Sequence, residues 1–218
     1  MTSILTYISV LAKGSCITLI AWLLAGTFSI VIGIGLGTVS CKNYAHPILR
    51  FFIGIYTFIA KGIPAYVQIL IAYFVIPNLL GINISGFCAA IGALAFCSGG
   101  YVTAIIRASI NNIPQGQWDA AFVLGYPLSV ALWRIILPQA LHLAHASLFG
   151  ELEQLLKSTS LLATIGVTEL TRTGMNIISR ELNPLPIYGI IALLYLLFST
   201  VLYLVSINIE KRTSYGYR

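Results

Sequence analysis

The sequence predicts an all-α integral membrane protein with about five transmembrane helices. Of its 218 residues, 58% are hydrophobic and only 8% are charged, and the mean hydropathy is +0.93. A soluble domain of this length needs far more charged side chains to cover its surface. The apolar runs are long and continuous, which is typical of membrane helices rather than of the alternating strands of a barrel.

We expect one transmembrane domain over residues 1–218, with spans at about 16–39, 48–76, 85–110, 139–165 and 187–209. The first span is too long for a signal peptide. Its glycines Gly33, Gly35 and Gly37 permit close contact between helices. Pro64 predicts a kink in the second span near Lys61, because proline removes a backbone hydrogen bond.

The third span contains Gly99-Gly100, which we interpret as a flexible pair. The fourth span is the most polar. A segment at 168–179 is too short to cross a membrane and is expected to form a separate helix. Pro184 and Pro186 then precede the last span.

The distribution of lysine and arginine predicts the orientation. Basic residues near span ends divide seven to three between the two faces, and cytoplasmic loops carry the excess. The larger group is Lys42, Arg50, Arg107, Arg134, Lys211, Arg212 and Arg218, and the smaller is Lys13, Arg172 and Arg180. We therefore expect the connector at 111–138 and the C-terminus in the cytoplasm, and the N-terminus outside. The basic residues are scattered and lie at span ends, so we expect no nucleic-acid partner.

The connector at 111–138 is too polar and too short to span a bilayer. Pro114 suits the first turn of a helix, Gly125 a tight turn, and Pro127 the start of a second short helix. Such a helix pair suits docking to a soluble partner, although an ordinary amphipathic loop at the membrane surface is also consistent with these residues.

The spacing of Asp119-Ala120-Ala121, Gly125 and Leu137-Pro138 resembles the cytoplasmic EAA loop of ABC importer permeases, with Asp119 in place of the usual glutamate. The resemblance covers nearly the whole chain, and it is strongest to permeases for polar amino acids such as histidine, glutamine and arginine. The other matching motifs are Gly14 with Thr18-Leu19, Lys61-Gly62-Ile63-Pro64 with Val67-Gln68, Ile113-Pro114-Gln115-Gly116-Gln117-Trp118, Gln139-Ala140, Lys157 with Thr159-Ser160-Leu161, and Glu169-Leu170-Thr171-Arg172.

The resemblance implies a permease subunit that pairs with a second copy or a sister subunit in a bacterial cytoplasmic (inner) membrane. Two cytoplasmic ATPases would bind the EAA loops, and an extracytoplasmic binding protein would deliver the amino acid. The residues implied in ATPase coupling are Asp119, Ala120, Ala121, Gly125, Leu137 and Pro138. The chain has no G-x-x-x-x-G-K-[ST] sequence, so we expect no ATP hydrolysis and no cofactor of its own.

Ionisable and polar residues inside spans are costly and are therefore candidates for a substrate pathway. The candidates are Lys61, Pro64, Gln68, Glu153, Lys157 and Ser160. At about 100° per residue, Glu153, Lys157 and Ser160 share one stripe of the fourth span, and Glu151 points to the opposite face. Glu153 and Lys157 are also placed to form an internal ion pair, which would only hold helices together.

Other polar residues have simpler interpretations. Glu169 and Arg172 are expected to pair with each other or to contact the binding protein. The spacing of His142 and His145 suits a metal, but few other ligands lie nearby, so hydrogen bonding is favoured. The four cysteines suit packing rather than disulfides.

The family pattern is broken at three places. Ala104 and Ser158 stand where acidic residues are usual, and Glu153 where an apolar residue is usual. The amino acid transported is therefore left open. The sequence also admits a stand-alone carrier or channel for small polar solutes, or a membrane scaffold, although a scaffold needs no buried charges.

Overall fold

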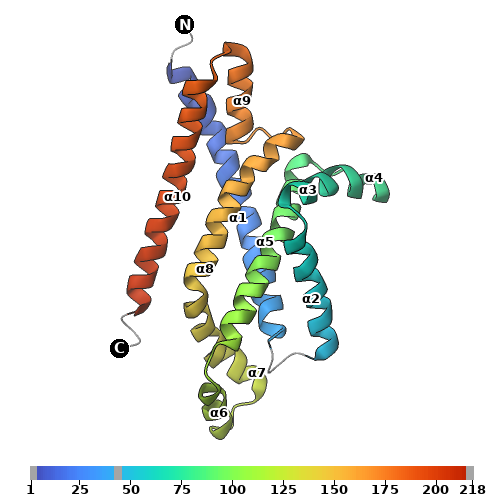
Figure 1. The fold of residues 1–218 in the computed structure, drawn as a ribbon, viewed down its shortest axis with the longest axis vertical. Helices are drawn as coiled ribbons and strands as arrows, with labels where there is room; N and C mark the ends of the chain where they lie inside the picture. Colours follow the sequence, from blue (N-terminus) through green and yellow to red (C-terminus); the bar gives the residue numbers. More distant parts are fainter. Residues whose placement is uncertain (1–3, 42–45, 215–218) are drawn as a thin grey trace. The chain divides into compact units, whose positions relative to one another are not determined.

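The computed structural model describes residues 4–41 and 46–214, and every regular element in these ranges is a helix (Figure 1). The elements are α1 (Ile4–Val39), α2 (Pro47–Gly62), α3 (Ala65–Leu70), η1 (Ile71–Val75), α4 (Ile76–Leu80), α5 (Gly86–Asn111), α6 (Gln115–Val123), α7 (Leu128–Ala131), η2 (Leu132–Ile136), α8 (Leu137–Ser158), η3 (Thr159–Ile165), α9 (Leu170–Glu181) and α10 (Pro184–Ser214).

The chain forms two compact units, each assembled from separate segments. Unit 1 comprises the chain up to Thr27 together with Ile63–Ala95 and Leu152–Leu204. Unit 2 comprises Phe28–Gly62, Phe96–Glu151 and the chain from Val205 onward. Each unit has its own buried apolar residues.

Three described helices are long and apolar enough to cross a membrane, at Tyr7–Val39, Gly86–Asn111 and Pro184–Lys211. The broken pair Pro47–Gly62 and Ala65–Leu80 makes a fourth span if it is counted as one. By contrast, α8 has 22 residues but is too polar to qualify by composition. The fourth predicted span, at 139–165, therefore stays a prediction.

The kink expected at Pro64 is a full break, because α2 ends at Gly62 and α3 begins at Ala65. Pro64 adopts φ −56° and ψ 137°, an extended conformation that no α-helix continues through. The buried side chain of Gln68 donates a 2.7 Å hydrogen bond to the carbonyl of Ile63. This bond satisfies a carbonyl within the break, where an unpaired one is costly in a membrane.

Two π-helical turns, η1 and η2, each end two residues before a proline. The N–H of Ile76, which precedes Pro77, bonds to the carbonyl of Ile71, and the N–H of Leu137, which precedes Pro138, bonds to that of Leu132. Proline has no N–H to give to the carbonyl four residues earlier. The wider turn accommodates this loss without ending the helix.

In unit 2, glycines let two helices approach α5 closely. A Cβ at Gly33 would overlap Val102, and one at Gly37 would lie 2.7 Å from the Cβ of Ile106. Gly35 has nothing within 4 Å, so only two of the three expected α1 glycines contact α5. Val102 and Ile106 belong to the buried core of this unit.

Gly99 and Gly100 serve the same purpose, and the prediction of a flexible pair was wrong. Helix α5 runs unbroken through both. A Cβ at Gly99 would lie 2.7 Å from the hydroxyl of Tyr56, and one at Gly100 would lie 2.5 Å from the Cβ of Ala60. The two glycines are therefore the contact surface for α2.

In unit 1, the carboxylate of Glu169 is fully buried and joins three helices. It caps α9 by accepting hydrogen bonds from the backbone N–H groups of Thr171 (2.8 Å) and Arg172 (2.7 Å). The hydroxyl of Tyr195 on α10 donates to it at 3.1 Å, and that of Thr18 on α1 at 3.4 Å. The sequence suggested a pair with the Arg172 side chain, but the contact is to its backbone.

Burial raises the pKa of the Glu169 carboxyl above its ordinary value of 4.5, and the hydrogen bonds from Thr171, Arg172 and Tyr195 oppose the shift. Helix α9 has 12 residues, too few to cross a bilayer, which confirms the expected non-crossing helix near 168–179.

We predict that Gly33→Leu destabilises the folded protein by about 1–3 kcal/mol, because its side chain would overpack α1 against α5. Gly35→Leu on the same helix is the matched control and should change stability far less. Thermal unfolding in detergent measures both. Equal effects of the two variants would contradict the packing described.

A Glu169→Gln variant should gain stability relative to the parent chain as pH rises. In the parent chain, the folded state binds the Glu169 proton more tightly than the unfolded state does. Protonated Glu169 therefore stabilises the parent fully below pH 4.5, and this stabilisation is lost as pH rises through the raised pKa. Unfolding temperatures of both proteins between roughly pH 4 and 8 test this. A constant difference between them would show that Glu169 does not titrate differently on unfolding.

Candidate functional site

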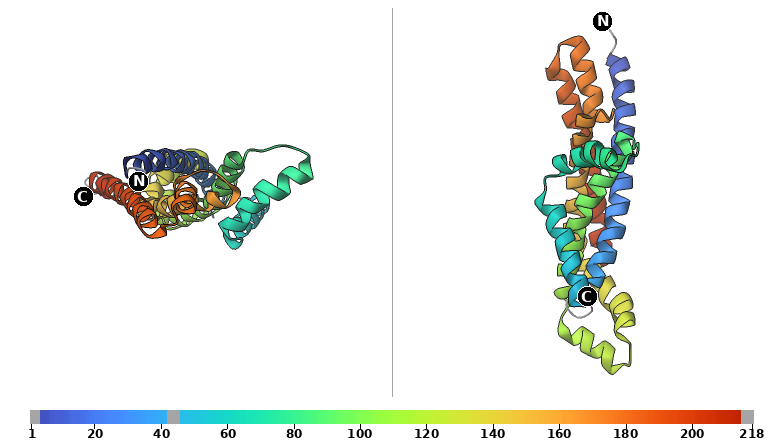
Figure 2. Two further views of the ribbon diagram at one scale, coloured as in Figure 1. Left: turned by 90° about the horizontal axis from the view of Figure 1, so that it is seen from above. Right: turned by 90° about the vertical axis from the view of Figure 1, so that its right-hand side faces the viewer.

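The connector at 111–138 folds into two short helices, α6 and α7, joined by a tight turn (Figures 1 and 2). The N–H of Gly125 bonds to the carbonyl of Phe122 at 2.9 Å, and that of Tyr126 to Ala121 at 3.1 Å. These two bonds form a Schellman motif, which requires a left-handed residue after the helix. Gly125 has φ +78°, which explains why glycine occupies this position.

The connector is anchored to unit 2 by its own buried side chains. Trp118 and Ala121 are 2% exposed, and Trp118 packs in the same core as Leu137. The Gln139 amide donates to the Gln117 side chain at 3.3 Å, which ties α8 to α6. The connector is therefore a built element rather than a loose loop.

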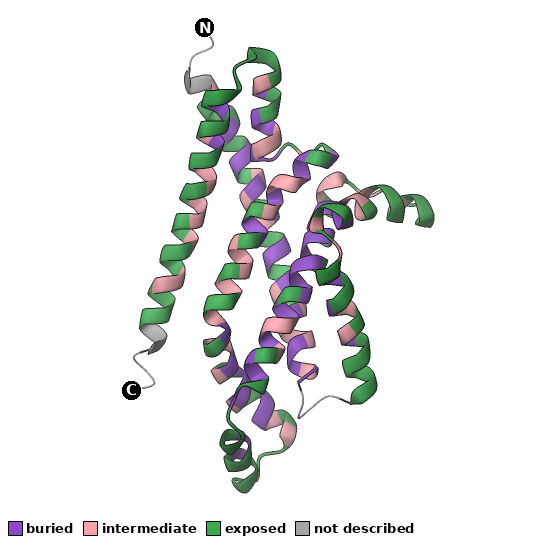
Figure 3. Ribbon diagram, viewed as in Figure 1, coloured by how far each residue is buried: buried purple, intermediate pink, exposed green. Residues whose placement is uncertain are grey.

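The outer surface at the end of α6 is apolar. Val123 is 86% and Leu124 74% exposed, and Phe122 and Tyr126 are also exposed (Figure 3). Exposed apolar side chains clustered on a short element mark an interaction site for another protein or for a membrane. Sequence reasoning missed these residues, because they lie at the end of α6, where helical periodicity no longer reports which side faces inward.

Of the six residues expected in ATPase coupling, four are exposed and two are buried. Asp119, Ala120, Gly125 and Pro138 are exposed, and the Asp119 carboxylate accepts a 3.1 Å hydrogen bond from Gln115. Ala121 and Leu137 are buried and can act only by supporting the others.

The six residues expected along a pathway lie in both units, and five of them are in contact, in two separate groups. Lys157 and Glu153 form a 2.7 Å ion pair, with side chains 54% and 37% exposed. The Ser160 hydroxyl donates to the carbonyl of Lys157 at 2.8 Å. Pro64 and Gln68 form the break described above, whereas Lys61 belongs to unit 2.

Glu151, which sequence reasoning assigned to the face opposite Glu153, lies in unit 2 near Ser98 and Lys61. The ammonium of Lys61 sits over the Tyr101 ring, 5.4 Å from its centroid, within cation–π range. Among the described residues no group of three or more potential metal ligands occurs.

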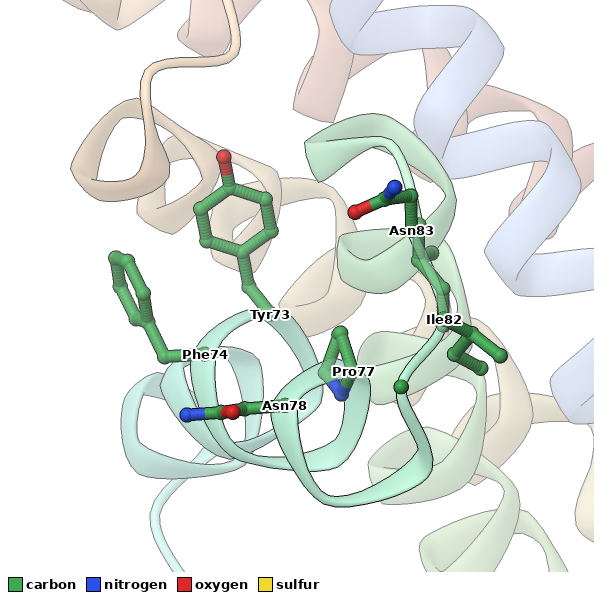
Figure 4. A pocket seen from close by; sticks show the side chains of 8 residues that line it. Tyr73, Phe74, Pro77, Asn78, Ile82 and Asn83 are labelled. Atoms are coloured by element: carbon green, nitrogen blue, oxygen red, sulfur yellow. The ribbon is translucent and has the colours of Figure 1, made fainter.

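Unit 1 also contains a surface pocket of about 460 Å³ between η1, α4 and the chain before α5. Figure 4 shows Tyr73 and Phe74 on one side and Ile82 and Asn83 on the other. No charged side chain lines it, so it lacks partners for the charged ends of an amino acid. It contains none of the residues predicted from the sequence.

Comparison with known proteins identifies the family. Residues 29–215 match the model of the binding-protein-dependent transport system inner membrane component. The chain is 38% identical over 160 residues to a putative glutamine transport system permease protein of Rickettsia typhi, covering 73% of this chain and 72% of the relative. It is 31% identical over 200 residues to an arginine transport system permease protein of Bacillus subtilis, covering 92% and 90%.

Solved structures agree. A crystal structure of an amino acid ABC transporter with histidines matches with a TM-score of 0.86 and 29% identity, covering 97% of this chain and 100% of that one. An inward-facing methionine ABC transporter matches in fold, with a TM-score of 0.81 at 18% identity. The chain therefore belongs to the binding-protein-dependent transport system inner membrane components and has the fold of an ABC importer permease.

Proposed function

We propose that this chain carries a polar amino acid across a bacterial cytoplasmic membrane, driven by a separate ATPase that docks on α6. The observation that carries the proposal is the apolar end of α6, held by the Schellman turn at Gly125 and anchored through Trp118. An exposed apolar surface on a braced helix gains stability when a partner covers it.

Membership in the family implies partners of two kinds, an ATPase and a binding protein. The names of the relatives favour glutamine, arginine or histidine as the cargo. The chain lacks a phosphate-binding loop sequence, so ATP would be hydrolysed on the partner and not here. A second permease subunit would complete the pathway.

Coupling requires that the ATPase bias one two-state element of the permease. In this proposal, α6 transmits that bias through Gln117, Trp118 and the continuous helix from α7 into α8. Lys61, Pro64, Gln68, Glu153, Lys157 and Ser160 remain the proposed lining of the pathway. The connector and C-terminus would face the cytoplasm and the N-terminus the outside, as basic residues predict.

The direct test is reconstitution. The chain should co-purify with a co-expressed ATPase, and liposomes holding both should take up an amino acid only with ATP and a binding protein. Uptake without any ATPase would instead support a stand-alone carrier or channel, the alternative that the sequence admits.

We predict that Gly125→Val abolishes ATPase docking, whereas Gly125→Asn retains much of it. A β-branched residue in the left-handed region is strained by about 1–2 kcal/mol, and asparagine tolerates this region best after glycine. A Cβ here meets nothing within 4 Å, so backbone strain rather than a clash is responsible. Co-purified ATPase per permease measures the effect. Normal docking by Gly125→Val would oppose the role of the turn.

Val123→Asp should reduce ATPase docking by about tenfold or more, because it places a charge in the centre of an apolar interface. Val123→Ala should have a smaller effect, and Ser129→Asp, at an exposed polar position on α7, provides the charge-matched control. Membrane insertion should be normal for all three. A Val123→Asp variant that binds the ATPase at full affinity would show that this surface is not the interface.

A further inference from the structure

Unit 1 contains a further surface pocket, of about 480 Å³, that the proposed function does not use. It is formed by α1, by the beginning of α5 and by the chain between η3 and α9. The residues that line it are Ile17, Ile20, Phe87, Gly166, Val167 and Thr168. A pocket of this volume can hold a small molecule. The side chains that line it are apolar apart from the Thr168 hydroxyl.

The pocket lies where the hydrocarbon of a bilayer would end. Helices α1 and α5 are both long and apolar enough to cross a membrane, and they pack side by side, with Ala21 and Ala90 buried in one core. Phe87 is in the first turn of α5, whose 26 residues extend about 39 Å. Because the hydrocarbon layer is only about 30 Å thick, this first turn lies at the boundary between hydrocarbon and headgroups.

The polar end of the pocket points toward the N-terminal end of α1. Ile165 is buried in the same core as Ala21, whereas a Cβ at Gly14 would lie 3.0 Å from the Cα of Leu170. The chain from Ile165 to Leu170 therefore runs along α1 toward its N-terminal end. Thr168 lies near the end of this path, so its hydroxyl is on the headgroup side.

Lys13 lies beyond this polar end, on the face of α1 that carries Ile17 and Ile20. Residues four and seven apart on a helix share a face, and Lys13 is about 6 Å further along the axis than Ile17. That distance places it at the level of the headgroups. Its side chain is exposed and makes no ion pair with a carboxylate of the described residues.

We propose that this pocket binds one phospholipid, with an acyl chain against Ile17, Ile20 and Phe87 and the phosphate on Lys13. A cation, a hydroxyl and an apolar surface follow one another along α1 in the order of phosphate, glycerol ester and chain in a lipid. An amino acid fits less well, because no carboxylate lines the pocket to pair with its ammonium group. The site is separate from the docking surface on α6, and it does not depend on the transport function.

The test is photocrosslinking of the chain in micelles of an uncharged, phosphate-free detergent. Phosphatidylglycerol with a diazirine in one acyl chain is the probe, and diacylglycerol with the same chain is its phosphate-free counterpart. Peptide mass spectrometry locates the adducts. Phosphatidylglycerol should label the pocket residues in preference to Val31, an exposed residue of α1 in unit 2. Diacylglycerol should label the pocket about fivefold less, the factor expected from one lysine near a membrane surface.

Two variants test the two ends of the site separately. Lys13→Gln should reduce labelling by phosphatidylglycerol to the level of diacylglycerol, and Lys13→Arg should retain it. Arg180→Gln, at an exposed position of α9, is the charge-matched control and should behave like the parent. Ile20→Trp should fill the pocket and lower labelling by both probes, with Val31→Trp as its control. Lys13 is exposed, so Lys13→Gln decides the question even if Ile20→Trp fails to fold.

A second experiment identifies the occupant in native membranes. A photoreactive p-benzoylphenylalanine in place of Ile17 should capture phospholipid. Capture of a second protein chain instead would make the pocket a protein interface and overturn the proposal.

Three results of the micelle experiment also overturn the lipid site. The first is equal labelling of the pocket and of Val31 by phosphatidylglycerol. The second is full labelling of Lys13→Gln, which would remove the phosphate contact. The third is displacement of the probe by excess inorganic phosphate, because a site for the anion alone needs no acyl chain.

Discussion

Close approach of helices to α5 is the constraint on which unit 2 depends. In a bilayer, apolar side chains gain little by leaving lipid for one another, so helices associate through tight packing of small residues. Gly33 and Gly37 provide this for α1, and Gly99 and Gly100 for α2. The short separation between α2 and α5 also brings Lys61 close to Tyr101. It is possible because Gly99 and Gly100, next to Tyr101, have no side chains to hold the two helices apart.

The elements that depend on local composition were predictable. Apolar runs located α1, α5 and α10 to within a few residues at most ends, although α1 begins well before residue 16, and Pro64 located the break between α2 and α3. The neighbours that each helix face contacts were less predictable. A helical wheel puts Glu151 and Glu153 on opposite sides, and the spacing of Glu153 and Lys157 predicted their ion pair, which the structure confirms. Only the fold reveals that Glu151 belongs to unit 2. Gly99 and Gly100 likewise suggest flexibility in the sequence, and only the neighbouring helix α2 shows that they are packing positions.

The connector was predictable in location and turn type, because Gly125 and Pro127 are specific to a turn followed by a helix. Which side chains of the connector are exposed on its outer surface was not predictable. Ala120 and Ala121 look alike in sequence, yet the first is exposed and the second is buried. The most exposed apolar residues, Val123 and Leu124, lie at the end of the helix, where periodicity no longer reports which side faces inward.

The π-turn before Pro138 has a geometric consequence for α8. One surplus residue in a helix advances every later side chain by about 100° around the axis. The azimuth at which α8 presents Ala140, Ala144 and Glu151 to α5 is therefore set by a residue count within Leu132–Ile136. A single deletion there would leave every residue downstream unchanged. It would still rotate the Glu151 carboxylate by about 100° around the axis of α8, away from its present direction.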